Sequence, residues 1–176
     1  MDTKGFGDGF YLASEADGFR GPFNEDARCN VYNLHGGLHL FLREDGGTEK
    51  RLAGADGGID AIAKTINEVH RLPIYVAEAD SQAKQKKIAS VPYLSRCFQR
   101  LKESSGCFFI YGHSADESDA HIYNALFTFK ISHLYYCIYD QKKLAMLDGR
   151  LANYQQSNKS RVTYTFVDSR SAGVWG

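Results

Sequence analysis

The sequence predicts an α/β domain with a mainly parallel sheet and helices on both faces. Short apolar runs of strand length alternate along the chain with longer stretches whose apolar residues recur at helical spacing. One run, residues 107–111, is apolar throughout, as expected of a strand that is buried on both faces. Strands separated by helices imply right-handed crossover connections, which place the strands parallel to one another.

The composition fits one ordinary domain and excludes several classes of protein. The chain has 176 residues, of which 43% are hydrophobic, with 21 basic and 21 acidic side chains. We expect no nucleic-acid partner, because a balanced charge offers no field that attracts a phosphate backbone. The apolar stretches fall short of the roughly 20 residues that cross a bilayer. Residues 1–10 lack the basic start and apolar run of a secretory signal, so we expect a cytoplasmic protein with no membrane partner.

The chain divides into an irregular segment, residues 1–27, and an α/β domain, residues 28–176. Glycines and a proline mark turns at residues 5–9 and 20–22. The Gly-x-Gly-x-Gly pattern in the first turn is typical of phosphate loops. We interpret it as a simple turn, because no strand pattern precedes it and no helical pattern follows it.

Regular structure is expected from Cys29 onward. Six runs predict strands, at residues 29–34, 38–42, 72–77, 107–111, 133–139 and 162–167. Five stretches predict helices; their apolar stripes include Ile59, Ile62, Ile66 and Val69 in the first helix and Ile122, Ala125, Leu126 and Phe129 in the fourth. The cysteines form no CxxC pair, so we expect them to be small core residues: Cys29, Cys97, Cys107 and Cys137.

Candidate functional residues follow two of the predicted strands, because parallel sheets bind ligands at the carboxyl ends of their strands. His35 follows the first strand, where an imidazole can act as a general base, although a lone histidine is more often structural. In the segment 112–119, Gly112 lets the backbone approach a ligand and Ser114 offers a hydroxyl. The alternative is a plain helix start, capped by Ser114, Asp116 or Ser118, with Asp119 complementing the helix dipole.

Histidines and a carboxylate could also form a metal site, which would make the protein a metal-dependent hydrolase. The residues concerned are His35, His39, His113, Asp119 and His121. Their spacing does not favour this hypothesis, because Gly36 and Gly37 argue against a helix that would bring His35 and His39 onto one face. We therefore expect no metal.

Two segments, residues 31–41 and 109–122, resemble the paired motifs of bacterial sirtuin-like proteins. More narrowly, the chain is similar to an uncharacterised bacterial family in that group, which carries a strand ending in Leu-His-Gly, a later Gly-x-Ser and a downstream Asp-x-His. The resemblance implies a Rossmann-like fold and an NAD-hydrolase-like protein linked to antiviral defence. It implies that His35 is the general base at the nicotinamide riboside part of NAD, and that the cofactor-binding residues are Gly36, Gly112, His113, Ser114 and Asp119.

The family pattern begins with a strand, a Gly-Ala-Gly-x-Ser phosphate loop and a Thr-x-Asn-Tyr-Asp segment, and none of these precedes Val31. We therefore expect a carboxyl-terminal portion of the fold that lacks its nucleotide-loop unit. NAD binding by this chain alone is expected to be weak or absent, without catalysis. A second hypothesis is a non-enzymatic binding or assembly module, which associates with itself or with a companion chain.

Overall fold

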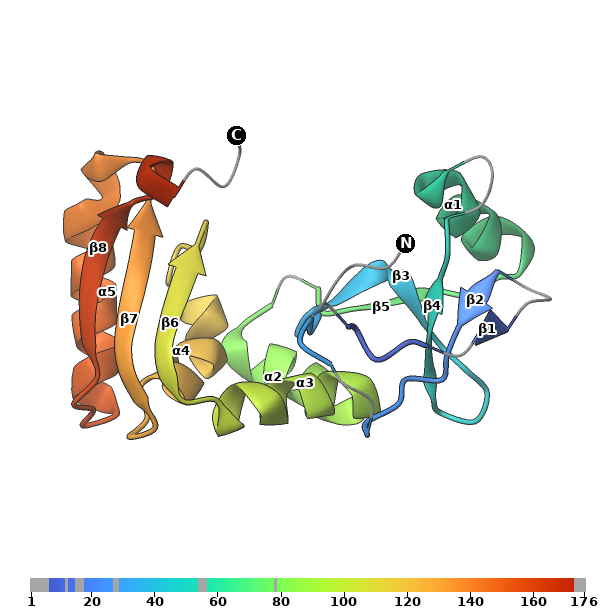
Figure 1. Cartoon of the computed structure of the whole chain (residues 1–176), viewed down its shortest axis with the longest axis horizontal. Coiled ribbons are helices and arrows are strands. Elements are labelled where there is room, and N and C mark those ends of the chain that lie inside the picture. Colours follow the sequence, from blue (N-terminus) through green and yellow to red (C-terminus); the bar gives the residue numbers. More distant parts are fainter. Residues whose placement is uncertain are drawn as a thin grey trace. The chain divides into compact units, whose positions relative to one another are not determined.

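The computed structural model describes residues 7–11, 13–14, 18–26, 29–53, 57–77 and 79–172. These residues form an α/β fold with two sheets and five α-helices (Figure 1). The chain divides into two compact units: the first comprises residues 1–78 and 84–99, and the second comprises residues 79–83 and 100–176. The turn expected at residues 5–9 begins outside the described residues. Among the described helices, none is long and apolar enough to cross a membrane.

The first unit contains a five-stranded sheet whose paired strands are all antiparallel. A tight turn between its two longest strands makes them a hairpin, as the Gly- and Asp-rich segment 44–48 predicts. Only the sheet of the second unit is parallel, so the expectation of a mainly parallel fold holds in part. The order across the sheet of the first unit is β1 (Ala13–Ser14), β2 (Phe19–Arg20), β4 (Thr48–Arg51), β3 (Gly36–Leu42) and β5 (Pro73–Tyr75).

Residues 29–34 were expected to form a strand, and this prediction is wrong. Only Cys29 pairs, in an isolated bridge with Asp8. The segment is instead held as a loop, because the backbone and side-chain amides of Asn33 donate hydrogen bonds to the Tyr93 hydroxyl at 3.1 and 3.3 Å. Tyr32 and Leu34 pack against the core from this loop rather than from a strand. His35 therefore follows a loop and directly precedes β3.

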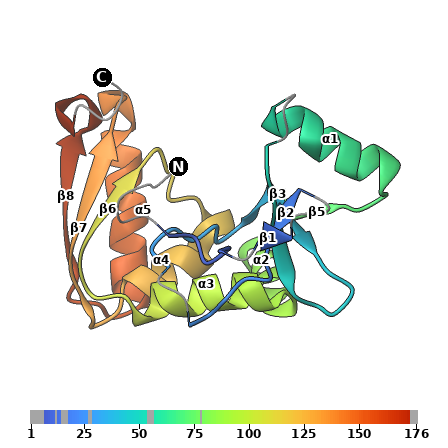
Figure 2. The same cartoon turned by 45° about the vertical axis from the view of Figure 1, so that its right-hand side comes forward.

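Helices cover both faces of this antiparallel sheet (Figure 2). Helix α1 (Gly58–Glu68) packs against β3 and β4. The opposite face packs against residues of α2 (Ser81–Ser90) and α3 (Pro92–Glu103), including Ile88 and Leu94. Neighbouring residues Leu40 and Phe41 of β3 point to opposite faces and are both fully buried, which shows that neither face is left open.

Helix α1 forms where its apolar spacing predicts it, but it buries a different face. Ile59 is 83% exposed and Val69, just beyond the helix, is 56% exposed. The buried residues are the small Ala61 and Thr65, which are four apart and let the helix backbone come close to the sheet. Arg51 of β4 then reaches the Ala61 carbonyl at 3.4 Å. The most buried positions are thus small residues, and the predicted stripe is divided: Ile62 and Ile66 are half-buried, whereas its two ends are exposed.

The second unit is built on a parallel sheet of three strands in the order β6 (Gly106–Tyr111), β7 (Ile131–Ile138) and β8 (Thr163–Asp168). Helices α4 (Ala120–Leu126) and α5 (Leu144–Ser157) provide the crossovers and lie on one face of the sheet (Figures 1 and 2). Their buried residues share a core with Leu134 and Tyr136 of the central strand. The sequence correctly predicts these three strands and their parallel order.

Within the second unit, no described helix covers the other face of this parallel sheet, and β6 is half-exposed, which corrects the prediction that residues 107–111 are buried on both faces. Strand β6 alternates: Phe108 and Ile110 pack against the core, whereas Phe109 is 64% exposed. Cys107 is exposed rather than in the core, whereas Cys97 and Cys137 are buried as expected; all four cysteines are free thiols. Phe129, expected on the stripe of α4, is 94% exposed because α4 ends at Leu126.

Candidate functional site: the loop after strand β6

The candidate site is the loop of residues 112–119, which leaves the carboxyl end of β6. Strands β6, β7 and β8 are parallel, so Gly112, Asp140 and Asp168 lie at or just beyond the carboxyl ends of these strands, at the same edge of the sheet. Gly112 has φ +63°, a left-handed conformation that glycine adopts at little cost. A Cβ atom at this position would meet no atom within 4 Å. The backbone of Gly112 is therefore open to a ligand.

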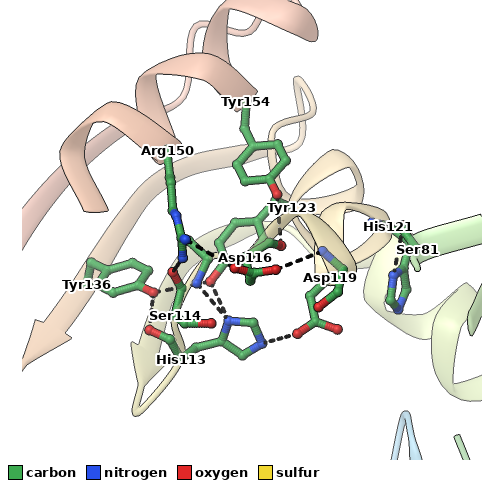
Figure 3. Close-up of polar contacts among 12 residues, drawn as sticks. Ser81, His113, Ser114, Asp116, Asp119, His121, Tyr123, Tyr136, Arg150 and Tyr154 are labelled. Carbon is green, nitrogen blue, oxygen red and sulfur yellow. Dashed lines mark hydrogen bonds and ion pairs between the residues drawn. The ribbon is translucent and has the colours of Figure 1, made fainter. Parts of the chain in front are cut away.

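The loop is held from the side of the core by long side chains of β7 and α5 (Figure 3). Arg150 donates from Nη1 to the Ser114 carbonyl oxygen at 2.7 Å, and its Nη2 lies 3.1 Å from the Asp116 carboxylate. The Tyr154 hydroxyl donates to the Asp116 carbonyl at 3.0 Å, and the Tyr136 hydroxyl donates to the His113 carbonyl. These bonds fix the loop backbone before any ligand arrives.

The imidazole of His113 is engaged on both ring nitrogens. Its Nδ1 accepts a hydrogen bond from the Ala115 N–H at 3.2 Å and lies 2.9 Å from the Tyr123 hydroxyl. A backbone N–H can only donate, so the proton of the neutral ring is on Nε2, which faces the Asp119 carboxylate at 3.4 Å. Ala115 is buried with φ +52°, a conformation that these contacts impose. His113 thus shapes the loop, and its contact with a cofactor stays a prediction.

Three tyrosine hydroxyls support this arrangement and remain protonated at neutral pH. Burial raises the pKa of Tyr123, and the adjacent hydroxyl of Tyr136, 3.3 Å away, raises it further. Burial likewise raises the pKa of Tyr136 and of Tyr154. The rings of Tyr123 and Tyr154 are stacked with centroids 4.9 Å apart, which adds packing to the hydrogen bonds.

The start of the helical segment after the loop is acidic. Asp116 caps a short 3₁₀ turn, Glu117–Asp119, by accepting from the Ser118 N–H at 3.2 Å. Of the three candidate caps, Asp116 fulfils the role, and the exposed Ser114 hydroxyl makes no hydrogen bond to any described residue. Carboxylates at this end neutralise the helix dipole, so they disfavour a bound phosphate. They favour hydroxyl groups, from which a carboxylate accepts hydrogen bonds.

An open depression of about 600 Å³ adjoins this segment within the second unit. Beneath it, Ser81 connects the start of α2 to α4: its Oγ accepts from the His121 N–H at 2.9 Å and lies 3.2 Å from the His121 Nδ1. His121 is 1% exposed, so Ser81, which lines the depression, is anchored to a buried side chain. The lining residues are Ala79, Asp80, Ser81, Gln82, Glu117 and Ser118.

The predicted site residues fall into two groups. Gly112, His113, Ser114 and Asp119 lie together in the loop of the second unit, whereas His35 and Gly36 belong to the first unit. Gly36 has φ +77°, and a Cβ there would lie 2.1 Å from the Ile74 carbonyl oxygen. The close approach of β5 therefore requires this glycine. His35 is half-buried, and its carbonyl accepts from the Val76 N–H at 2.8 Å.

Sequence reasoning missed the residues that hold the loop. Arg150, Tyr136 and Tyr154 come from β7 and α5, more than twenty residues further along the chain than Ser114. No local spacing marks them, because they meet the loop only after the crossover helices have packed on the sheet. The one usable signal is topological: a helix that follows a parallel strand returns over the sheet, so α5 passes beside the loop after β6.

The fold and this loop define a two-unit α/β protein with a preformed backbone site at the carboxyl edge of a parallel sheet. The chain belongs to the family described as "Domain of unknown function (DUF4917)", which matches residues 1–175. No curated protein and no solved structure matches the chain. The resemblance to sirtuin-like proteins therefore stays a prediction.

Proposed function

We propose that the loop 112–119 binds ribose hydroxyls of NAD, and that the chain is the carboxyl-terminal portion of a sirtuin-like, NAD-consuming protein. The observation that carries this proposal is the pairing of an exposed Gly112 and an exposed Ser114 hydroxyl on a loop that Arg150 holds rigidly. Three parallel strands with crossover helices support a Rossmann-like origin for this unit.

The electrostatics favour the ribose over the phosphates of the dinucleotide. Asp116, Glu117 and Asp119 cluster at the loop, and the nearby cation, Arg150, is already paired with Asp116. A pyrophosphate would meet these carboxylates as like charges. A ribose would instead donate hydrogen bonds from its hydroxyl groups to a carboxylate, which is how nucleotide-binding folds recognise ribose. The Ser114 hydroxyl can complete this recognition as a donor or an acceptor.

Affinity for NAD should be low, because the loop supplies few contacts. Each neutral hydrogen bond contributes on the order of 1 kcal/mol net, whereas immobilising a ligand costs several kcal/mol. We expect the chain alone to bind NAD more weakly than about 1 mM. With His35 as the proposed general base, we expect no nicotinamide release from the chain alone. Chromatography of an NAD incubation checks this, and release that His35→Ala abolishes would show that the site is complete.

The proposal is tested by amide chemical shifts in the presence of three separate ligands. Nicotinamide riboside and ribose should shift the amide signals of Gly112 and Ser114, whereas inorganic pyrophosphate should not. A Ser114→Ala variant should reduce the ribose response, and Ser90→Ala, on α2 in the first unit, serves as a control. Shifts caused by pyrophosphate alone, or by none of the three ligands, would contradict the proposal.

We also propose a cytoplasmic location for this function. All four cysteines are free thiols, including the exposed Cys107, and exposed thiols persist in reducing compartments. Thiol titration of the protein isolated under non-reducing conditions checks this proposal, because loss of the Cys107 thiol to a disulfide would argue for an oxidising compartment.

A further inference from the structure

The face of the parallel sheet opposite α4 and α5 presents nine side chains, of which Cys137 is buried and the other eight are exposed or half-buried. The strand register places them in three rows across β6, β7 and β8. The rows are Cys107, His133 and Thr163; Phe109, Tyr135 and Thr165; and Tyr111, Cys137 and Val167. We name these nine residues the open face.

Five of the nine side chains of the open face are held by contacts with one another. The rings of Phe109 and Tyr135 are stacked, with centroids 4.7 Å apart. The two ring nitrogens of His133 lie 2.7 and 3.0 Å from the hydroxyls of Thr163 and Thr165. A surface that is already ordered loses little conformational entropy when a partner covers it.

An open face on a parallel sheet conflicts with a general rule, because parallel sheets are almost always covered on both faces. The open face exposes aromatic side chains, with Phe109 and Tyr111 64% and 43% exposed. It contains no Asp, Glu, Lys or Arg. A partner must therefore offer an uncharged surface, since a charged one would lose its hydration without finding a counter-ion. A second copy of the open face meets this condition.

The sizes of the side chains on the open face also suit packing against a second copy of the same face. The edge strand β6 presents the bulky Phe109 and Tyr111, whereas the opposite edge strand β8 presents the smaller Thr165 and Val167. A two-fold axis parallel to the strands would place the β6 of each copy over the β8 of the other. The bulky side chains of β6 in one copy then pack over the small side chains of β8 in the other copy. Such a self-complementary contact is typical of a symmetric dimer.

We propose that the open face is a homodimer interface, in which two copies pack face to face about a two-fold axis parallel to the strands. Three strands spaced about 4.8 Å apart, each contributing the five residues of the paired register, give a footprint of roughly 14 by 17 Å. This area is well below the 800 Å² or so that each partner buries in a standard interface. The dimer is therefore transient, with a dissociation constant weaker than about 1 μM.

Sedimentation of the full chain over a range of concentrations measures this association. We expect a reversible monomer–dimer equilibrium. Phe109→Asp should weaken it by about tenfold or more, because the interface would bury an unpaired carboxylate. Phe129→Asp is the matched control: Phe129 is 94% exposed, lies outside the open face, and its replacement should leave the equilibrium unchanged. A wild-type chain that stays monomeric, or a control that weakens association equally, would overturn the proposal.

A charge-swap experiment tests the direction of the two-fold axis. In the proposed dimer, residue 109 of one copy faces residue 165 of the other, so Phe109→Asp and Thr165→Lys should each weaken association. An equimolar mixture of the two variants should restore it, because one contact becomes an ion pair and the other keeps the native side chains. If the axis were perpendicular to the strands, residue 109 would face residue 109 and the mixture would not dimerise. That outcome would refute the proposed geometry.

Discussion

Parallel sheets are generally covered on both faces, whereas antiparallel sheets often leave one face exposed. The two sheets of this protein show the reverse. The antiparallel sheet of the first unit is buried on both faces, by α1 and by residues of α2 and α3. The parallel sheet of the second unit has helices on one face, and its open face exposes aromatic rings. The comparison shows that strand direction alone does not determine coverage. The helices that follow each strand determine it.

The two units also use arginine differently. In the first unit, Arg71 pairs with the buried Glu49 at 2.5 Å and lies over the rings of Phe19 and Phe41. In the second unit, Arg150 is directed at backbone and carboxylate oxygens of the loop 112–119. The first arginine stabilises a covered sheet face. The second shapes a loop, so its loss should affect binding more than folding.

The largest predicted effect is a difference in unfolding free energy between substitutions on the covered face of one sheet and on the open face of the other. Phe41→Ala should destabilise the protein by about 3–5 kcal/mol, because this fully buried ring leaves a cavity. Phe109→Ala should cost less than about 1 kcal/mol at low protein concentration, because most of the ring is already exposed. Urea unfolding measures both values. Equal losses would mean that the open face is covered within one chain.

The next largest effect on stability is expected from the two arginines that pair with carboxylates, Arg71 and Arg150. Arg71→Met should destabilise by about 2 kcal/mol, because Glu49 keeps only its more distant partner, Arg43, at 3.7 Å. Arg150→Met should change the unfolding free energy by less, since both members of the Arg150–Asp116 pair are partly exposed. It should instead increase amide hydrogen exchange at residues 115–118. An equal rise in exchange after Arg71→Met would argue against a specific role for Arg150.

High pH should weaken the second unit through its buried tyrosines. Burial raises the pKa of Tyr123, Tyr136 and Tyr154 in the folded chain above the unfolded value of about 10. Their contribution to stability is therefore fully present below about pH 10 and is lost as the pH rises through the folded pKa values. We expect the last part of the tyrosinate absorbance, that of these three side chains, to appear together with the loss of structure, and Tyr136→Phe to reduce the pH dependence. Complete tyrosinate formation without unfolding would contradict these pKa directions.

The sequence predicted most of the elements correctly but often misjudged which side of an element is buried. Periodicity located α1, yet the packing was decided by Ala61 and Thr65 rather than by Ile59. The apolar run of β6 suggested burial on both faces, but apolarity cannot reveal whether a later helix returns to that side. Residues 29–34 have the apolar pattern of a strand, but only Tyr32 and Leu34 pack against the core, and they do so from a loop that Tyr93 holds.

For the candidate site, the sequence identified the residues that face outward and missed those that hold them. Gly112 and Ser114 were found because glycine and serine after a buried strand have a local meaning. Arg150 and Tyr154 carry no such local signal, since their role depends on the packing of α5. Gly36 stays a predicted cofactor-binding residue, and in the structure its backbone lies close to that of Ile74.

The central claim is that the exposed backbone of Gly112 receives the ribose of NAD, and two matched glycine variants test it most directly. Gly112 and Gly46 both have positive φ, and a Cβ at either position meets no atom within 4 Å. Gly112→Ala and Gly46→Ala should therefore cost a similar 1 kcal/mol or so of backbone strain. In an NAD titration followed by amide shifts, Gly112→Ala should abolish the response of the loop 112–119, and Gly46→Ala should preserve it. An unchanged response in Gly112→Ala would contradict the account.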